Sequence, residues 1–223
     1  MSLPLFRRCF AELIGTFCLV VIGCGAIAVD SRTELLGHPG VAIVWGLIVM
    51  TMIYAIGDLS GAHINPAVSI AFAVVKRLPW IDALVYSVSQ VLGAILGAAA
   101  IVVILGVDDS KLGSTMITVP PFAGLAVEFL MTAMLMFIVM GVSTGAKEKS
   151  ITAGLAVGGT IAMQAFVAGP LTKASMNPAR SLGPAIVATY PDHLWLYLVG
   201  PFAGAITGAW VYQALRGDDP QVP

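Results

Sequence analysis

Hydrophobic residues form long, nearly uninterrupted stretches along the chain, and polar and charged residues gather in the short segments between them. A helix that crosses a lipid bilayer needs about 20 predominantly apolar residues. Six stretches meet or approach this length, at residues 8–29, 41–57, 82–106, 121–141, 151–168 and 194–215. The pattern therefore predicts an all-α membrane protein, with residues 1–223 forming a single domain.

Two further hydrophobic runs are too short to span the bilayer, and each follows an Asn-Pro-Ala sequence that begins at Asn65 or Asn177. Asn is a preferred helix N-cap, and Pro suits the first helical turn because its missing N–H would be unpaired there anyway. We therefore expect short helices at residues 66–75 and 178–187. Non-helical backbone at membrane depth is tolerated only where protein buries it or it lines a water-filled cavity, so the two runs indicate a pore.

The sequence also repeats itself. Residues 11–16 correspond to 127–132, residues 65–67 to 177–179, and residues 93–97 to 204–208, at offsets of 116, 112 and 111 residues. Repeat 1 covers about residues 1–106 and repeat 2 about residues 121–216. Because each half holds an odd number of spanning helices, the second half is inverted, and the two short helices meet near the bilayer midplane. The glycines in the third landmark let neighbouring helices approach closely.

Composition agrees with burial in lipid. The chain is 58% hydrophobic and only 10% charged, whereas roughly a quarter of the residues of a soluble domain are charged. A net charge of −1 gives no reason to expect nucleic acid as a partner. Cys9, Cys18 and Cys24 share the first stretch and are expected to be reduced packing residues. The three histidines lie far apart in sequence, so neither a metal site nor a cofactor is expected.

The distribution of basic residues predicts the orientation, because cytoplasmic loops of membrane proteins are enriched in Lys and Arg. With the N-terminus inside, the cytoplasmic side receives Arg7, Arg8, Lys76, Arg77, Lys147, Lys149 and Arg216. Only four basic residues fall on the outer side, and the last of them is expected within the protein: Arg32, Lys111, Lys173 and Arg180. We expect a multi-pass protein of the cell membrane with both termini cytoplasmic. The alternative, a cleavable signal peptide at the N-terminus, is disfavoured by the length of the first stretch and by Glu12.

The segments around the two Asn-Pro-Ala sequences resemble the paired motifs of the major intrinsic proteins, the aquaporins and glycerol facilitators. They read Gly-Ala-His-Ile-Asn-Pro-Ala-Val at residues 61–68 and Ser-Met-Asn-Pro-Ala-Arg-Ser at residues 175–181. A single such motif is often an ordinary helix cap, but a pair at matching repeat positions is highly specific. The resemblance covers nearly the whole chain. It implies six transmembrane helices plus two re-entrant half-helices, assembled as a homotetramer with one pore in each subunit.

The paired motifs, Asn65-Pro66-Ala67 and Asn177-Pro178-Ala179, are expected at the pore centre, where two helix N-termini each carry roughly half a positive charge. The two Asn amides can donate to a passing water, which then cannot accept from its neighbours, and the positive potential disfavours hydronium and metal cations. Backbone carbonyls would supply acceptors along one wall, and apolar side chains would form the other. The carbonyls belong to Gly61, Ala62, His63 and Ile64, and to Lys173, Ala174, Ser175 and Met176.

Arg180 lies one turn into the second half-helix, and a charge at membrane depth is functional by default. A snorkelling surface Arg is the alternative. The resemblance places Arg180 in an outer constriction together with Trp45, Ala165 and Ala174. A shift of one residue would replace Ala165 by Gln164 or Phe166.

The constriction departs from that of strict water channels, for which the resemblance implies Phe and His at the first two positions. Trp45 with two alanines makes a wider, one-sided apolar opening, closer to that of glycerol-passing members. Ser181 and Ala185 instead follow the water-channel pattern, since glycerol facilitators usually carry Asp and a basic residue there. Lys173 is a further departure, because the family often has Gly at this position.

Glu12 and Glu128 are predicted to be buried carboxylates. By resemblance they accept hydrogen bonds from the re-entrant loops, and proton transfer is the less favoured role. His63 is either a hydrogen-bonded loop residue or a gate. The aromatic residues Trp80, Trp195 and Tyr197 are expected to anchor helices at the membrane interface.

These observations predict a passive channel for osmotically driven water flow that also admits glycerol or other small uncharged solutes and excludes protons and ions. A glycerol facilitator is the nearest alternative. Inverted repeats also build alternating-access carriers, but beyond Glu12 and Glu128 no acidic residue is expected inside the membrane to couple an ion. A purely structural or adhesive protein would pass no solute. No nucleophile–base pair or cofactor loop suggests an enzyme.

Overall fold

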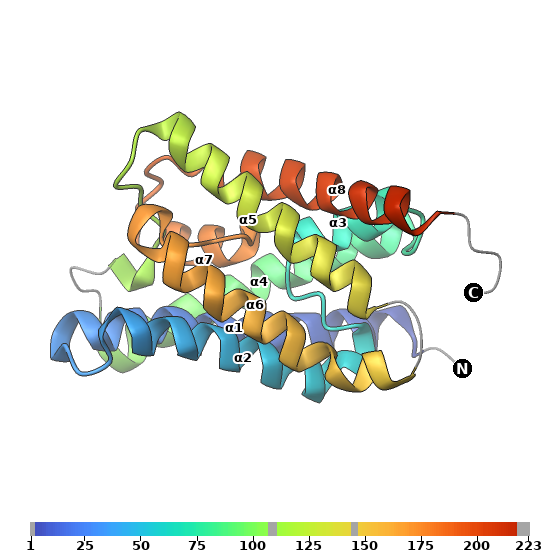
Figure 1. The fold of residues 1–223 in the computed structure, drawn as a ribbon. Helices are drawn as coiled ribbons and strands as arrows, with labels where there is room; N and C mark the ends of the chain where they lie inside the picture. The colour runs from blue at the N-terminus through green and yellow to red at the C-terminus, as the bar shows by residue number, and fades with distance from the viewer. Residues whose placement is uncertain (1–2, 107–110, 144–146, 218–223) are drawn as a thin grey trace.

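The computed structural model describes residues 3–106, 111–143 and 147–217, and within these residues the fold is entirely helical (Figure 1). Eight α-helices and one short 3-10 turn follow one another along the described chain. Their bounds are α1 (Leu5–Thr33), α2 (Gly37–Ser60), α3 (Pro66–Val74), α4 (Trp80–Leu105), η1 (Lys111–Gly113), α5 (Pro121–Val142), α6 (Lys147–Thr172), α7 (Pro178–Val187) and α8 (Leu196–Arg216).

Five of the described helices are long and apolar enough to cross a membrane: α1, α2, α4, α5 and the Thr152–Thr172 part of α6. The sixth long helix, α8, has 21 residues. It is not among the five, because polar or weakly apolar residues such as Pro201, Tyr212 and Gln213 dilute its hydrophobic character. The all-α class predicted from the sequence, with six long helices and two short ones, is confirmed.

The order of helix packing is the same in the two halves. The most extensive contacts join α1 to α4 and α5 to α8, and α1 also packs on α2 as α5 packs on α6. The short helices α3 and α7 each contact both α4 and α8, and they meet each other. Figure 1 shows α3 and α7 toward opposite ends of the bundle, with the first residues of α1 and the last of α8 at one end. The residue boundaries of the two repeats stay a prediction.

Glycines allow the closest contacts between helices. A Cβ atom at Gly97 of α4 would lie 2.8 Å from the Phe17 carbonyl oxygen of α1, and one at Gly208 of α8 would clash with the backbone of Ala133 in α5. Small residues let two helix backbones approach in this way. The packing role expected for these glycines is confirmed, and the two tight pairs frame the space into which the half-helices insert.

Candidate functional site: a cavity between two half-helices

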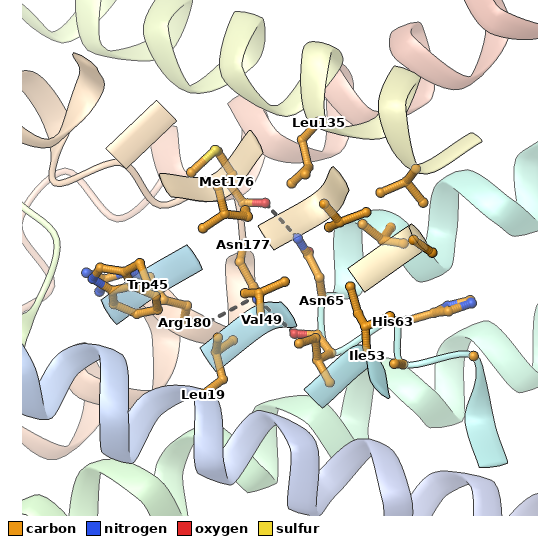
Figure 2. Close-up of a pocket in the computed structure, with 18 of the residues that line it drawn as sticks. Leu19, Trp45, Val49, Ile53, His63, Asn65, Leu135, Met176, Asn177 and Arg180 are labelled. Atoms are coloured by element: carbon orange, nitrogen blue, oxygen red, sulfur yellow. Dashed lines mark hydrogen bonds between the residues drawn. The ribbon is translucent and has the colours of Figure 1, made fainter. Parts of the chain in front are cut away.

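A cavity lies between the half-helices, and residues from both halves of the chain line it (Figure 2). Most of its wall is apolar, with polar groups from the two loops that precede α3 and α7. The apolar lining includes Leu19, Val49, Ile53, Val68, Phe72, Leu135, Val139, Val142, Val157 and Ile161. Such a wall holds water weakly, because it offers no hydrogen-bond partners.

Asn65 and Asn177 cap the two half-helices as the sequence predicts. The side-chain oxygen of Asn65 accepts from the backbone N–H of Ala67 at 2.9 Å. That of Asn177 accepts from Ala179 at 3.0 Å and from Arg180 at 3.3 Å. Pro66 and Pro178 follow as the first helical residues. Both short helices therefore begin where local cap chemistry dictates, and both asparagines line the cavity.

Each asparagine is also hydrogen-bonded to the loop that precedes the other half-helix, which the sequence analysis did not predict. The Asn65 amide donates to the carbonyl oxygen of Met176 at 2.7 Å, and the Asn177 amide donates to that of Ile64 at 2.8 Å (Figure 2). Each amide thus bonds the loop that precedes the other half-helix. Since an amide NH2 has two hydrogens, each asparagine keeps one donor beyond this crossed pair.

Both loops contain left-handed residues at matching places. Ala62 and Ile64 have φ angles of 48° and 42°, and Ala174 and Met176 have φ angles of 46° and 53°. A left-handed conformation in a residue other than Gly costs on the order of 1–3 kcal/mol and persists only where the surroundings impose it. The loops are therefore strained, and something must hold them.

Glu12 and Glu128 hold these loops. Glu12 accepts from the backbone N–H groups of His63 at 2.9 Å and Ile64 at 2.6 Å. Glu128 accepts from those of Ser175 at 3.0 Å and Met176 at 2.8 Å. Both carboxylates are fully buried. Their contacts are those that the expected structural role requires.

Further polar residues complete this support, and the sequence analysis did not predict this role for any of them. Ser60 and Gln90 donate to Glu12, as Thr172 donates to Glu128. The hydroxyls of Tyr86 and Tyr197 donate to the carbonyl oxygens of Ser60 and Thr172. The two tyrosines are 111 residues apart, the offset of the third repeat landmark, and this spacing could have revealed them. Tyr197 is fully buried, so the expectation that it anchors a helix at the membrane interface is wrong.

The four residues expected at the constriction, Trp45, Ala165, Ala174 and Arg180, all line the cavity. Gln164 does not line it and donates instead to the Met131 carbonyl oxygen. Phe166 lies outside the lining and is 39% exposed. Of the three alternatives at this position, Ala165 is the one at the cavity.

Arg180 is only 1% exposed, which excludes a snorkelling surface residue. Its Nη1 donates to the Gly113 carbonyl oxygen at 2.9 Å, and its guanidinium carbon lies 4.7 Å from the centre of the Trp45 ring. Its Nε and Nη2 atoms have no hydrogen-bond partner within the described part of the chain. In Figure 2 the Trp45–Arg180 pair and His63 lie toward opposite ends of the cavity, with the asparagines between them.

Most of the loop residues whose backbone carbonyls were expected along the pore wall do line the cavity. The first four, residues 61–64, and the last three, residues 174–176, line the cavity. Lys173 is not among the lining residues, and its N–H bonds the Gly169 carbonyl oxygen at the end of α6. His63 stacks on Phe72, and its Nδ1 lies 3.0 Å from the Ser69 hydroxyl. These contacts make His63 a hydrogen-bonded loop residue.

Within the described residues, no group of three or more His, Cys, Asp or Glu side chains could hold a metal ion. The cysteines Cys9, Cys18 and Cys24 are free. The polar groups that line the cavity are hydrogen-bond donors and acceptors of the two loops and of Arg180.

A bundle of long apolar helices around a cavity reached from both ends by half-helices defines a membrane channel. The chain belongs to the major intrinsic protein family, whose model matches residues 1–212. The expectation of a channel, and not of an enzyme, is confirmed by this membership.

Similar proteins agree with this assignment. Aquaporin NIP1-1 from Oryza sativa subsp. japonica is 44% identical over 216 residues, which cover 96% of this chain and 76% of the relative. Nodulin-26 from Glycine max is 40% identical over 220 residues, covering 98% and 81%. The X-ray structure of the aquaglyceroporin from Plasmodium falciparum superposes with a TM-score of 0.81 at 25% identity, covering 94% of this chain and 96% of that one.

Proposed function

We propose that the protein is a passive channel for osmotically driven water flow that also admits glycerol or other small uncharged solutes. The observation that carries the proposal is the pair of asparagines, one from each half of the chain, lining a single cavity. Similarity to an aquaglyceroporin supports the passage of a polyol as well as water.

Ion and proton exclusion follows from the pore centre. The N-termini of α3 and α7 meet there, and each carries roughly half a positive charge. A water molecule that accepts from an asparagine turns its own hydrogens away from the centre, which breaks a proton relay. Arg180 adds a full positive charge near one end of the cavity, and like-charge repulsion keeps out metal cations and hydronium.

The constriction supports glycerol entry. Trp45 supplies an apolar face for a carbon chain, while Ala165 and Ala174 leave the other sides of the opening wide. Among the described residues, Nε and Nη2 of Arg180 have no hydrogen-bond partner and can donate to hydroxyl groups. A small polyol thus finds an apolar and a polar wall in the same opening.

The test is stopped-flow light scattering on proteoliposomes, challenged first with sucrose and then with glycerol. The wild type should show water efflux in the first challenge and glycerol entry in the second. The double variant Trp45→Phe, Ala165→His should lose glycerol entry and keep water flow, because a larger side chain at 165 fills the opening. Unchanged glycerol entry in this variant would refute the constriction assignment.

We further propose that both termini face the cytoplasm of the cell membrane and that four copies form a homotetramer. Two observations support the orientation: α1 begins and α8 ends at one end of the bundle, and that end carries Arg7, Arg8 and Arg216 (Figure 1). Tags at either terminus should be cleaved by protease only after the cells are permeabilised. Native mass spectrometry tests the tetramer, and a monomeric mass would contradict it.

A further inference from the structure

Gly23, in the middle of α1, lies directly against the ring of Trp45. A Cβ atom at this glycine would lie 2.5 Å from Cη2 and from Cζ3 of the ring, and 2.7 Å from Cε3. Carbon atoms that are not bonded pack at about 3.5–4.0 Å. The Trp45 ring therefore occupies the space that any side chain at position 23 would fill.

The α2 backbone that carries Trp45 cannot retreat from α1. Its next residue, Gly46, abuts α6, where a Cβ atom would lie 2.6 Å from the Gly158 carbonyl oxygen. Gly158 abuts α2 in the same way, since its own Cβ would lie 2.6 Å from the Gly46 carbonyl oxygen. Because the backbones on this side are close-packed, the Trp45 ring can move only away from α1, toward the cavity that it lines and the Arg180 guanidinium that lies 4.7 Å from the ring centre.

We propose that Gly23 is a specificity-determining residue of the channel, because its missing side chain sets how far the Trp45 ring withdraws from the constriction. Gly23 itself does not line the cavity and acts through Trp45. The inference rests on the proposed function, in which Trp45 bounds the opening. A residue behind the constriction would thus adjust the size of solute that passes.

The test compares Gly23→Ala with Gly25→Ala, a matched substitution two residues along the same helix. At Gly25 a Cβ atom would meet nothing within 4 Å among the described residues. Ala is a better helix former than Gly, so neither change is expected to weaken α1. In proteoliposomes, Gly23→Ala should lower the ratio of glycerol to water permeability by about tenfold, the lower end of the effect of one extra carbon in a tight pocket. Gly25→Ala should keep the wild-type ratio.

A double-mutant comparison isolates the ring as the cause, since contacting residues show non-additive effects. In a Trp45→Ala background, Gly23→Ala should leave the ratio unchanged, because no ring remains to be displaced. A wild-type ratio in Gly23→Ala alone, or an equal fall in both backgrounds, would overturn the inference.

The same experiment separates this inference from the proposed function. A Trp45→Ala variant that changes the permeability ratio shows that Trp45 bounds the opening, whatever Gly23 does. A wild-type protein that passes neither water nor glycerol would overturn both proposals.

Discussion

Glu12 and Glu128 show how single side chains sustain an unfavourable backbone. A buried carboxylate is destabilising unless hydrogen-bonded donors surround it, and Glu128 accepts from Thr172, Ser175 and Met176. Two of these donors are backbone N–H groups of the strained loop. The same hydrogen bonds therefore satisfy the buried carboxylate and hold the strained loop in its conformation.

At Glu128, replacement by Gln should destabilise the fold. One carboxylate oxygen becomes an NH2 group, which cannot accept from Ser175 or from Met176, so at least one buried donor loses its partner. We expect the free energy of unfolding to fall by about 2 kcal/mol, the usual effect of an unsatisfied buried polar group. Thermal unfolding in detergent, followed by tryptophan fluorescence, measures the change.

Asp58→Asn is the control for this prediction, because it removes one carboxylate charge at an exposed position of α2. Its unfolding temperature should match that of the wild type. Equal unfolding temperatures for Glu128→Gln and Asp58→Asn would contradict the role given to Glu128.

Among the helices, the end of α6 shows how an interrupted element is completed by its neighbours. Pro170 lies inside α6 and has no N–H, so the Phe166 carbonyl four residues earlier lacks its usual donor. His38 of α2 supplies a donor to this carbonyl, and its Nε2 lies 2.8 Å from the Phe166 oxygen. Because a carbonyl only accepts, Nε2 carries the proton. Thr118 donates to the carbonyl oxygens of Pro170 and Leu171 in the same turn.

His38→Ala should loosen the junction between α2 and α6 near the constriction. Loss of the hydrogen bond between His38 and the Phe166 carbonyl is expected to lower the free energy of unfolding by about 1 kcal/mol. The ring also fills the space beside Gly169, where a Cβ atom would lie 2.6 Å from its Cε1. Thermal unfolding measures the loss, and His38→Gln, which keeps a donor, should recover part of it. Identical unfolding curves for wild type and His38→Ala would refute this contribution.

Local chemistry explains which parts of the fold could be predicted from sequence. The starts of α3 and α7 were predicted to the residue, because Asn caps a helix and Pro begins one without help from distant contacts. The repeat placed the two glutamates at matching positions, and resemblance to the family implied their role in holding the loops. The left-handed Ile64 and Met176 could not be predicted, because Ile and Met disfavour this conformation and only the distant carboxylates impose it.

Contacts between helices were the least predictable part of the site. His38 and Phe166 are 128 residues apart, and no repeat landmark includes either of them. Tyr197 was misassigned because its position near the start of a helix is typical of an interfacial anchor, whereas its hydroxyl reaches the Thr172 carbonyl inside the protein. The space that Gly23 leaves for Trp45 depends on how α1 and α2 pack, which the pattern of hydrophobic residues does not specify.

For the whole molecule, a single arrangement of the helices already encloses a cavity that residues from both halves line, as a channel requires. Apolar side chains from α1, α2, α3, α5 and α6 form most of its wall. Polar groups come from the loops that precede the half-helices and from Arg180 of α7. A carrier needs two alternating states, whereas a channel needs only this one. Temperature dependence of transport distinguishes the two mechanisms.

Water permeability of proteoliposomes should depend only weakly on temperature, and glycerol entry should rise linearly with the gradient. The reason is that no conformational step limits passage through a cavity that is already formed. Stopped-flow rates measured at several temperatures and compared with those of empty liposomes test this expectation. A pH-sensitive dye enclosed in the same vesicles should report no proton entry. Steep temperature dependence with saturation by glycerol would indicate a carrier instead.

The crossed bonds between the asparagines have a consequence for biosynthesis. When the ribosome has delivered only the first four helices, the Asn65 amide still lacks its acceptor on Met176, and the Ile64 carbonyl lacks the amide of Asn177. Glu12 of α1 can already hold the first re-entrant loop, but the hydrogen bonds of this loop are complete only after translation has supplied the second. We expect this conduit to be completed late in membrane insertion, so that a half-made chain leaves no open hole in the bilayer.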